Sequence, residues 1–165
     1  MASYRATFAN ELKKSLPRII LIEDADKFWA ISCKGRELAE IHLNYETQDP
    51  VQVEVSGVEK NNFVVDKLKL SKNKTTLYYN EHITIKNIPP RCFEYVVNGR
   101  SPLEWIIDRY QIKTDKASGI INDANDWGIE HGNPRYILDL ILSCITVSLK
   151  TLDIVENLPD VEFEA

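Results

Sequence analysis

The stretch YVVNGRSPLEWIIDRYQIKTDKASGIINDANDW, residues 95–127, carries the strongest local signals in the chain. Asn98 and Gly99 both tolerate a positive φ, so the chain can reverse direction at this point. Ser101 and Pro102 then mark a helix start, because the serine hydroxyl can accept from early backbone N–H groups and proline has the φ of a first helical residue. The sequence therefore predicts a turn followed at once by a helix.

The predicted helix has a capped start and one apolar face. Glu104 stands at the third helical position, where its carboxylate completes a capping box with Ser101. The apolar residues that follow recur at spacings of three, four and seven, with Trp105 on their flank. They are Leu103, Ile106, Ile107 and Tyr110. This face is expected to join the core.

A polar loop is predicted after Lys113. Residues 114–119, TDKASG, have a composition that ends helices and builds turns. Ile120 and Ile121 are expected to anchor this loop on the core before the second polar run, residues 122–126. The loop is therefore expected to be docked at both ends and to present polar groups between them.

Several stretches resemble one known family. Residues 96–127 and residues 134–159, PRYILDLILSCITVSLKTLDIVENLP, look like the C-terminal segment of the large single-chain Type ISP restriction-modification enzymes. Those enzymes are also often labelled DEAD/DEAH-box helicase-like proteins. FWAISCKGRELAEIHLNYE, residues 28–46, and YNEHITIKNIP, residues 79–89, are similar to the same region. The resemblance spans nearly the whole chain and implies a DNA target-recognition domain that follows methyltransferase, helicase and nuclease parts.

The pattern as a whole predicts an α+β fold, with a small antiparallel sheet of about four strands packed with N-terminal helices and a long C-terminal helix. A chain of 165 residues suits one domain with a single substantial core. The resemblance implies that this domain is a C-terminal fragment of a much larger multidomain chain. Its expected parts are a helical region, a sheet region and a helical region with the polar loop, residues 1–46, 49–88 and 89–158.

Local periodicity places the individual elements. Apolar spacing predicts helices over residues 2–14, from Asp24 or Asp26 to about Tyr45, over 91–97, and over 134–157, with a glycine-containing loop before the last. Alternation of apolar and polar residues predicts strands. These fall at 51–55, 63–70, 75–79 and 83–88, with a basic turn at 71–74. The last helix is apolar over so wide an arc that it is central to the domain or covered by a partner.

The charge is distributed unevenly along the chain. A net charge of −5 argues against DNA binding, because affinity for a duplex comes largely from cations that displace its counterions. Residues 67–116, however, hold ten Lys and Arg against five Asp and Glu, or +5, and the remainder holds ten against twenty, or −10. The basic middle is compatible with one positive face beside a duplex and equally with a solvated basic surface.

Candidate DNA contacts come from this basic middle and the polar loop. Arg, Lys, Asn and Gln are the natural readers of guanine and adenine in the major groove. The alternative for each is a solvated surface residue or a loop-structuring amide, and Arg109 has Asp108 and Glu104 nearby as ion-pair partners. The candidates are Lys72, Lys74, Arg100, Arg109, Gln111, Lys113, Lys116, Asn122 and Asn125.

No catalytic or metal-binding motif stands out in the sequence. A phosphate-binding glycine loop ending in Gly-Lys-Ser/Thr, the methyltransferase motifs, an acidic-x-Lys nuclease motif and a Gly-x-Ser-x-Gly elbow are all missing. Three widely separated cysteines fit reduced, mostly buried thiols better than disulfides or zinc. His42 is expected to be a packed imidazole and not a metal ligand. The chain alone is thus expected to be no enzyme and to use no cofactor or metal.

Membrane and secretion signals are also missing. Asp139 and Lys150 interrupt the best apolar run, and the N-terminus has no apolar signal-peptide core. A cytoplasmic location is expected.

The expected function is that of a sequence-specific DNA target-recognition domain of a restriction-modification enzyme, non-catalytic by itself. Its implied partners are double-stranded DNA and the methyltransferase and helicase domains of the parent chain, which the resemblance makes an ATP-dependent restriction enzyme. The alternative is a protein-interaction or coupling module of a helicase-like protein, in which the long apolar helix docks on a methyltransferase domain without reading DNA. An enzyme of an unrecognised kind is a third possibility.

Overall fold

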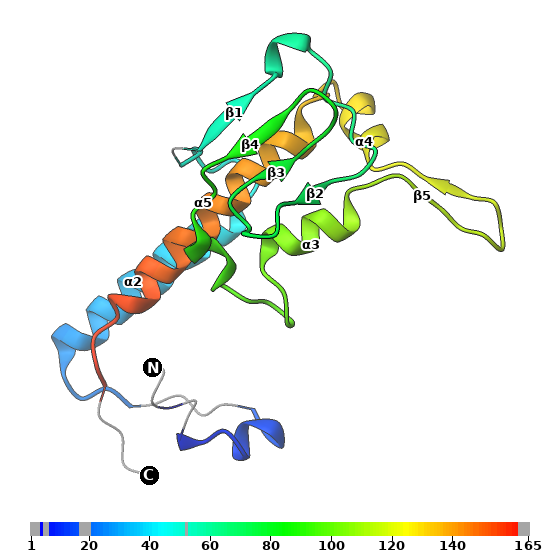
Figure 1. Cartoon of the computed structure of the whole chain (residues 1–165). Helices are drawn as coiled ribbons and strands as arrows, with labels where there is room; N and C mark the ends of the chain where they lie inside the picture. The colour runs from blue at the N-terminus through cyan, green and yellow to red at the C-terminus, as the bar shows by residue number, and fades with distance from the viewer. Residues whose placement is uncertain (1–3, 5–6, 17–20, 52, 162–165) are drawn as a thin grey trace. The chain divides into compact units, whose positions relative to one another are not determined.

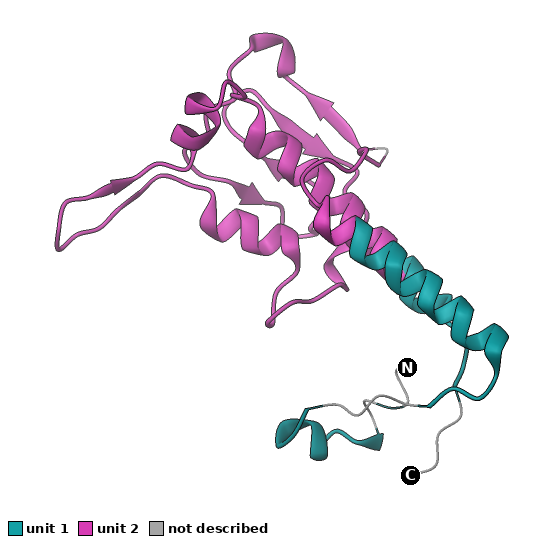
Figure 2. Cartoon of the chain, turned by 180° about the vertical axis from the view of Figure 1, so that it is seen from behind, with its two compact units in different colours: residues 1–40, 153–165 teal, residues 41–152 magenta. Residues whose placement is uncertain are grey.

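The computed structural model describes residues 4, 7–16, 21–51 and 53–161, and it divides into two compact units (Figure 1, Figure 2). Unit 1 consists of Met1–Glu40 and Asp153–Ala165, and unit 2 of Ile41–Leu152. Two long helices, α2 (Ala25–Leu43) and α5 (Tyr136–Glu156), contribute residues to both units. The predicted α+β class is confirmed.

Unit 1 contains the capped start of α2. The Asp24 carboxylate accepts hydrogen bonds from the backbone N–H groups of Asp26 at 2.9 Å and Lys27 at 3.1 Å, as the sequence predicted for this helix start. Phe28 and Trp29 make an edge contact with ring centroids 5.4 Å apart, yet both side chains are exposed. The predicted apolar side of α2 is therefore largely exposed over its first turns.

The N-terminal segment is described only in part. A 3-10 helix, η1 (Glu11–Lys13), lies within the predicted helix over residues 2–14. The remainder of that prediction at residues 2, 3, 5 and 6, and the predicted connection at 17–20, lie outside the described residues.

Unit 2 is built on a four-stranded antiparallel sheet with the order β1-β4-β3-β2. The strands are β1 (Glu54–Ser56), β2 (Lys69–Leu70), β3 (Leu77–Tyr78) and β4 (Thr84–Lys86). They are shorter than predicted, because the alternating pattern continues beyond the residues that pair. Val55 and Leu77 both stand opposite Ile85 of the central β4, which fixes the buried face of the sheet.

The core of unit 2 lies between this sheet and α5, which crosses behind the strands in Figure 1. Leu138, Ile141 and Ile145 of α5 are fully buried, as are Leu77 and Ile85 of the sheet. Each such side chain contributes about 1.5–3 kcal/mol relative to an exposed one. The wide apolar face of α5 is therefore buried in the core of this chain.

Hydroxyl groups on α5 hold the segment that leads into the sheet. The Ser143 hydroxyl donates to the Tyr45 carbonyl at 2.6 Å and accepts from the Gln48 backbone N–H at 2.8 Å. The Thr146 hydroxyl accepts from the Val51 N–H at 3.0 Å. These polar residues interrupt an otherwise apolar helix because they satisfy the backbone of an unpaired segment.

Four predicted elements differ from the structure. The 3-10 helix η3 (Pro90–Phe93) is shorter than the predicted helix over 91–97, and α3 (Pro102–Arg109) ends before Lys113. The predicted loop after it contains a hairpin of β5 (Lys113–Thr114) and β6 (Ile121–Asn122). Helix α4 (Asn125–Glu130) replaces part of the predicted glycine loop.

Position 57, just before the 3-10 helix η2 (Val58–Lys60), requires a glycine for two reasons: its backbone angle and the lack of room for a side chain. Its φ is 87°, and a Cβ there would lie 1.9 Å from the His82 carbonyl oxygen. Gly57→Ala is expected to lower the free energy of unfolding by about 3 kcal/mol, from backbone strain and displacement of that carbonyl. Urea denaturation of the purified variant measures this.

Gly99→Ala is the matched control for that prediction. Gly99 has a similar φ of 85° but open space around its missing Cβ. Gly99→Ala should lower the free energy of unfolding by only about 1 kcal/mol, which is the cost of the positive φ alone. Equal losses in the two variants would contradict a role for the His82 carbonyl.

The three cysteines form no disulfide, with Cys92 and Cys144 buried and Cys33 exposed. Burial raises the pKa of the Cys92 and Cys144 thiols to about 12, which keeps both protonated. Over the described residues, no group of three or more His, Cys, Asp and Glu is arranged to hold a metal ion. The described helices also include none with the length and apolar character needed to cross a membrane.

Candidate functional site

The turn before α3 places Arg100 at the start of the candidate site. Asn98 and Gly99 adopt positive φ angles of 52° and 85°, and the backbone N–H of Val97 donates to the Arg100 carbonyl at 2.8 Å. These contacts confirm the predicted reversal. The turn is followed by Arg100, whose guanidinium group contacts Trp105 and Asp108 of the helix that it precedes.

The predicted capping box of α3 is confirmed. The Ser101 hydroxyl accepts from the Glu104 backbone N–H at 3.3 Å, and the Glu104 carboxylate accepts from the Ser101 backbone N–H at 3.0 Å. The other Glu104 oxygen lies 2.8 Å from the Lys74 ammonium, which also sits 5.0 Å above the Phe93 ring. Lys74 therefore joins the basic turn of the sheet to α3.

These partners hold the pKa of the Glu104 carboxyl at about 2, chiefly through the Lys74 hydrogen bond and the Ser101 backbone N–H. Because the pKa of Glu104 is lower in the folded than in the unfolded protein, its ionised carboxylate stabilises the fold at pH values above the unfolded pKa near 4.5. This stabilisation is lost as the pH falls through the folded pKa. Allowing for screening of this partly exposed pair, Glu104→Gln should cost about 1–2 kcal/mol at neutral pH. The difference from the parent protein should shrink between about pH 4.5 and pH 2.

Urea denaturation across that pH range measures the effect, with Glu94→Gln as the control because Glu94 is exposed. If the loss in the free energy of unfolding caused by Glu104→Gln stays constant down to low pH, the carboxylate charge is not what stabilises the fold.

A cluster of cations surrounds Asp108 on α3. Its carboxylate lies 3.3 Å from Arg100 Nη1, 3.6 Å from Arg109 Nε and 3.8 Å from Lys113 Nζ. Lys113 also donates to the Asp108 backbone carbonyl at 2.7 Å. All four side chains are 40–68% exposed, so these pairs orient the cations more than they stabilise the fold.

Trp105 orients two of these cations. The guanidinium carbons of Arg100 and Arg109 lie 5.1 Å and 5.7 Å from its ring. Its indole N–H donates to the Val97 carbonyl at 2.7 Å, which fixes the ring against the turn. Two guanidinium groups are therefore held on one aromatic side chain at the surface.

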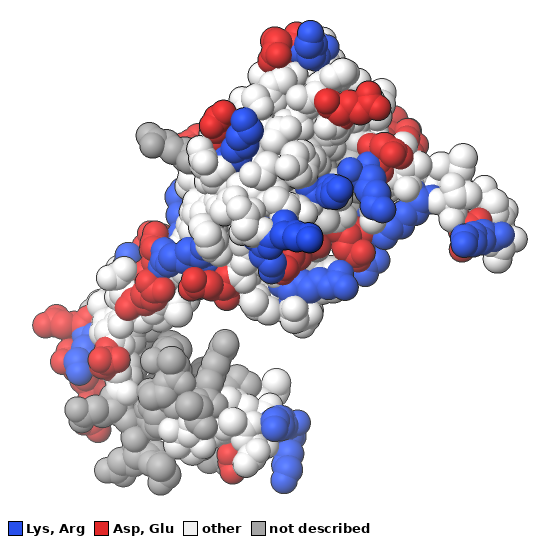
Figure 3. Space-filling model, in the orientation of Figure 1, with Lys and Arg blue, Asp and Glu red and all other residues white. Residues whose placement is uncertain are grey.

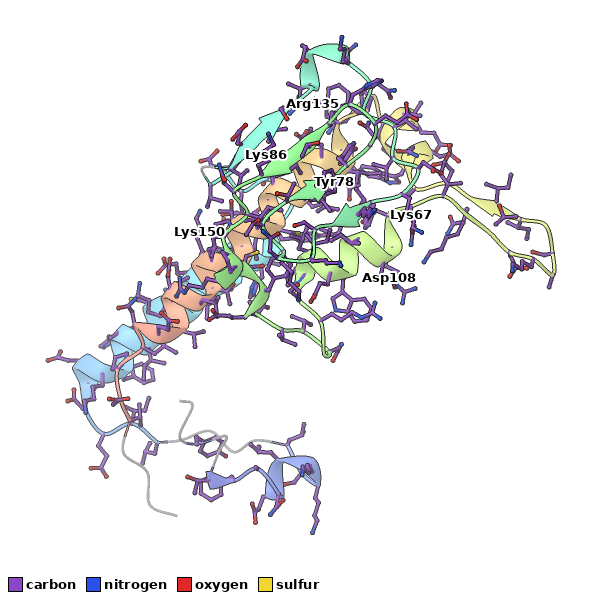
Figure 4. The ribbon with its side chains drawn as sticks, in the orientation of Figure 1. Lys67, Tyr78, Lys86, Asp108, Arg135 and Lys150 are labelled. Carbon is purple, nitrogen blue, oxygen red and sulfur yellow. The ribbon has the colours of Figure 1, made fainter. Side chains whose placement is uncertain are left out.

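Lys67 and Gln111 extend this surface across an open pocket of about 420 Å³ that also includes Arg100 and Asp108. Figure 4 labels Lys67 beside β2 and Asp108 on α3, facing the same side of unit 2. Basic side chains gather over β2 and α3 on this face in Figure 3. We call Lys67, Arg100, Asp108, Arg109 and Lys113 the Asp108 cluster; four cations and one carboxylate give it a charge of +3.

The hairpin β5–β6 extends from this cluster away from the rest of unit 2 (Figure 1, Figure 2). The Asp115 carboxylate organises its turn by accepting from the Ala117 and Ser118 backbone N–H groups at 3.0 Å and 2.7 Å. These bonds lower the pKa of Asp115. The predicted anchoring on the core is wrong: Ile120 and Ile121 are 66% and 65% exposed, because the turn is closed by its own hydrogen bonds.

Asn125 is a structural residue, and the prediction that it contacts DNA does not fit its position. The residue is 7% exposed, and its side chain bonds both backbone groups of the fully buried Val65: Oδ1 accepts from the N–H at 2.8 Å and Nδ2 donates to the carbonyl at 2.8 Å. The Tyr79 hydroxyl donates to the Phe63 carbonyl at 2.8 Å in the same segment. Side chains thus replace the strand pairing that was predicted for residues 63–65.

The structure brings five of the predicted residues to one region and separates the others. Arg100, Arg109, Gln111, Lys113 and Lys74 lie on or beside α3. Lys72 is exposed in the basic turn, and Lys116 and Asn122 are exposed on the hairpin. Sequence reasoning missed the contributions of Lys67 and Trp105. The alternation of lysines with buried leucines at residues 67–70 was a usable signal for Lys67.

Known proteins resemble this chain in both sequence and fold. Residues 1–140 match the family described as the Type ISP C-terminal specificity domain. A nuclease-deletion mutant of the Type ISP restriction-modification enzyme LlaGI, solved in complex with a DNA substrate mimic, is 49% identical with a TM-score of 0.87. The ATP-dependent Type ISP restriction-modification enzyme LlaBIII, solved bound to DNA, is 44% identical with a TM-score of 0.87.

These likenesses cover 99% and 98% of this chain, but only 13% of the LlaGI chain and 10% of the LlaBIII chain. The DrdV–DNA complex shares the fold, at 22% identity and a TM-score of 0.75 over 97% of this chain and 17% of that one. No curated protein sequence matches significantly. With the family match over residues 1–140 and two such relatives, the chain belongs to the Type ISP C-terminal specificity domains, a non-catalytic part of Type ISP restriction enzymes.

Proposed function

We propose that this chain is a DNA target-recognition domain, and that the Asp108 cluster with the β5–β6 hairpin is its DNA-binding surface. The observation that carries the proposal is the cluster itself: three cations are held around the Asp108 carboxylate and Lys67 lines the same open pocket, although the whole chain has a charge of −5. A local positive charge on an acidic protein directs a polyanion to one face.

The two parts of this surface suit different tasks. Arg100 and Arg109 are fixed by Trp105 and Asp108, so they suit phosphate contacts that set the position of the duplex. The hairpin presents Lys116 and Asn122 with exposed side chains beyond this cluster, so it suits contact with base edges. Lys72 and Lys74, from the basic turn, are further phosphate contacts in this proposal.

The relatives support a DNA partner. LlaGI and LlaBIII, at 49% and 44% identity, were both solved with DNA or a DNA mimic. We further infer that this chain is the C-terminal part of an ATP-dependent restriction enzyme with methyltransferase and helicase domains, which are then its partners within the parent protein. Because such an enzyme acts on cellular DNA, the proposal includes a cytoplasmic location.

The alternative of a coupling module depended on a free apolar face of the last helix. From Ile137 to Val147, however, nearly every α5 residue is buried within the chain, which leaves that part of the helix little apolar surface for another domain. The Asp108 cluster, by contrast, is exposed.

Fluorescence anisotropy measurements with the whole 165-residue chain test the proposal. Target duplexes are first selected from a randomised library, and binding is compared with a scrambled duplex between about 50 and about 200 mM salt. We expect the selected duplex to bind at least about 1,000-fold more tightly, with affinity that falls steeply as salt rises. Equal affinity for selected and scrambled duplexes would overturn the proposal.

A further inference from the structure

The β5–β6 hairpin has two different faces. Successive residues of a strand point to opposite sides of it. The register pairs Lys113 with Asn122 and Thr114 with Ile121. Lys113 and Asn122 therefore share one face of the hairpin, and Thr114 and Ile121 share the other.

Ile120 belongs to the first of these faces. The backbone N–H of Asp115 donates to the Ile120 carbonyl at 2.9 Å, which extends the pairing by one step beyond Thr114 and Ile121. By alternation, Ile120 lies on the same side as Asn122. We call the side with Lys113, Asn122 and Ile120 the reading face, and the side with Thr114 and Ile121 the back face.

The reading face is continuous with the Asp108 cluster. Lys113 lies on this face, and its ammonium donates to the Asp108 carbonyl at 2.7 Å. A duplex whose phosphates contact Arg100 and Arg109 would therefore meet this side of the hairpin. The paired residues of the back face are Thr114 and Ile121.

The exposed isoleucines do not form a patch for a protein partner. Ile120 and Ile121 are 66% and 65% exposed, but alternation puts them on opposite faces. A docking surface for a protein would gather apolar side chains on one side. Ile120 instead stands between the charged turn and Asn122, which is a mixed apolar and polar surface of the kind that reads base edges.

The dimensions of the hairpin suit the major groove. That groove is about 12 Å wide and about 8.5 Å deep and admits a two-stranded ribbon. The paired arms, residues 113–115 and 120–122, have three residues at about 3.3 Å each and extend about 10 Å from the base of the hairpin, comparable with the depth of the groove. The Asp115 hydrogen bonds hold the turn in place before binding, which reduces the entropy lost on association.

We propose that the β5–β6 hairpin enters the major groove with its reading face toward the bases. Ile120 contacts the 5-methyl group of a thymine, and the Asn122 amide pairs with an adenine edge. Residues two apart on one face are separated by about 6.6 Å, so the two contacts fall about two base pairs apart. This inference rests on the proposed function and adds specificity-determining residues to it.

The test compares Ile120→Ala with Ile121→Ala in the full-length protein, because the two changes are chemically identical at equally exposed positions. The probes are the selected duplex and versions with each thymine replaced by uracil, which lacks the methyl group. Ile120→Ala is expected to weaken binding about 3- to 10-fold, and uracil at one position to weaken the parent protein similarly but not Ile120→Ala. Ile121→Ala should bind within about twofold of the parent.

Equal effects of the two variants, or an Ile120→Ala loss that persists with uracil at every position, would overturn the inference. The selection also reports on Asn122→Ala, which should relax the choice of adenine at one position about two base pairs from that thymine. If the parent protein binds selectively while Ile120→Ala matches it, only the hairpin inference fails. If the parent protein shows no selectivity, the proposed function fails.

Discussion

Arg109→Glu is expected to weaken binding of the selected duplex by about 10- to 100-fold. The Arg109 side chain is 68% exposed, and its guanidinium lies beside Asp108. Replacing it with glutamate lowers the charge of the Asp108 cluster from +3 to +1 and puts a second carboxylate where a phosphate is proposed to bind. Loss of a phosphate contact also reduces the slope of log affinity against log salt by about 1. Anisotropy titrations over a salt series measure both quantities.

Lys60→Glu is the control for this prediction, because it changes the net charge by the same amount. Lys60 is exposed at the end of η2, in unit 2 but outside the Asp108 cluster. It should change affinity by less than about threefold, since salt screens the interaction of DNA with an exposed charge outside the binding surface. Equal weakening by the two variants would mean that only the overall charge matters, and the cluster would then not be the binding surface.

The sequence predicted the local parts of this site and missed its long-range parts. Ser101, Pro102 and Glu104 act within one helical turn, so the capping box could be predicted and is present. Lys67, by contrast, joins Arg100 only through the packing of the segment before β2 beside α3. Sequence spacing carries no information on such a contact.

Two elements of the fold, the β5–β6 hairpin and α4, were missed by the sequence prediction for similar reasons. The β5–β6 ladder has only two paired positions, too few for an alternating pattern to be recognised. Helix α4 contains Gly128, which ordinarily counts against a helix. A Cβ on Gly128 would lie 2.7 Å from the Asn133 carbonyl oxygen, so the glycine is needed for close packing and does not end the helix.

Asn122 and Asn125 show that the local sequence says little about what an individual asparagine does in the structure. Both lie in the run Asn-Asp-Ala-Asn, and both were predicted from this run as candidate DNA contacts. Asn122 is exposed on the hairpin, whereas Asn125 is buried against Val65, sixty residues earlier in the chain. The difference is set by tertiary structure, and it leads to opposite expectations for their variants.

Asn125→Ala is expected to destabilise the fold by about 3 kcal/mol with little direct effect on base recognition. The change removes hydrogen bonds to the N–H and carbonyl of Val65, and each buried group left without a partner costs about 1–3 kcal/mol. Val65 is fully buried and belongs to no strand, so no neighbouring strand can replace these bonds. For a chain of this size, the midpoint of thermal unfolding should fall by about 6–12 °C.

Asn122→Ala is the natural comparison, since it makes the same chemical change three residues away on an exposed side chain. Its stability should remain within about 0.5 kcal/mol of the parent protein, while its choice of bases relaxes. Asn125→Ala should show the reverse, with target preference retained below its unfolding temperature. An Asn125→Ala protein of undiminished stability that had lost its preference for one base would restore Asn125 as a reader. It would also require the contact with Val65 to open when DNA binds.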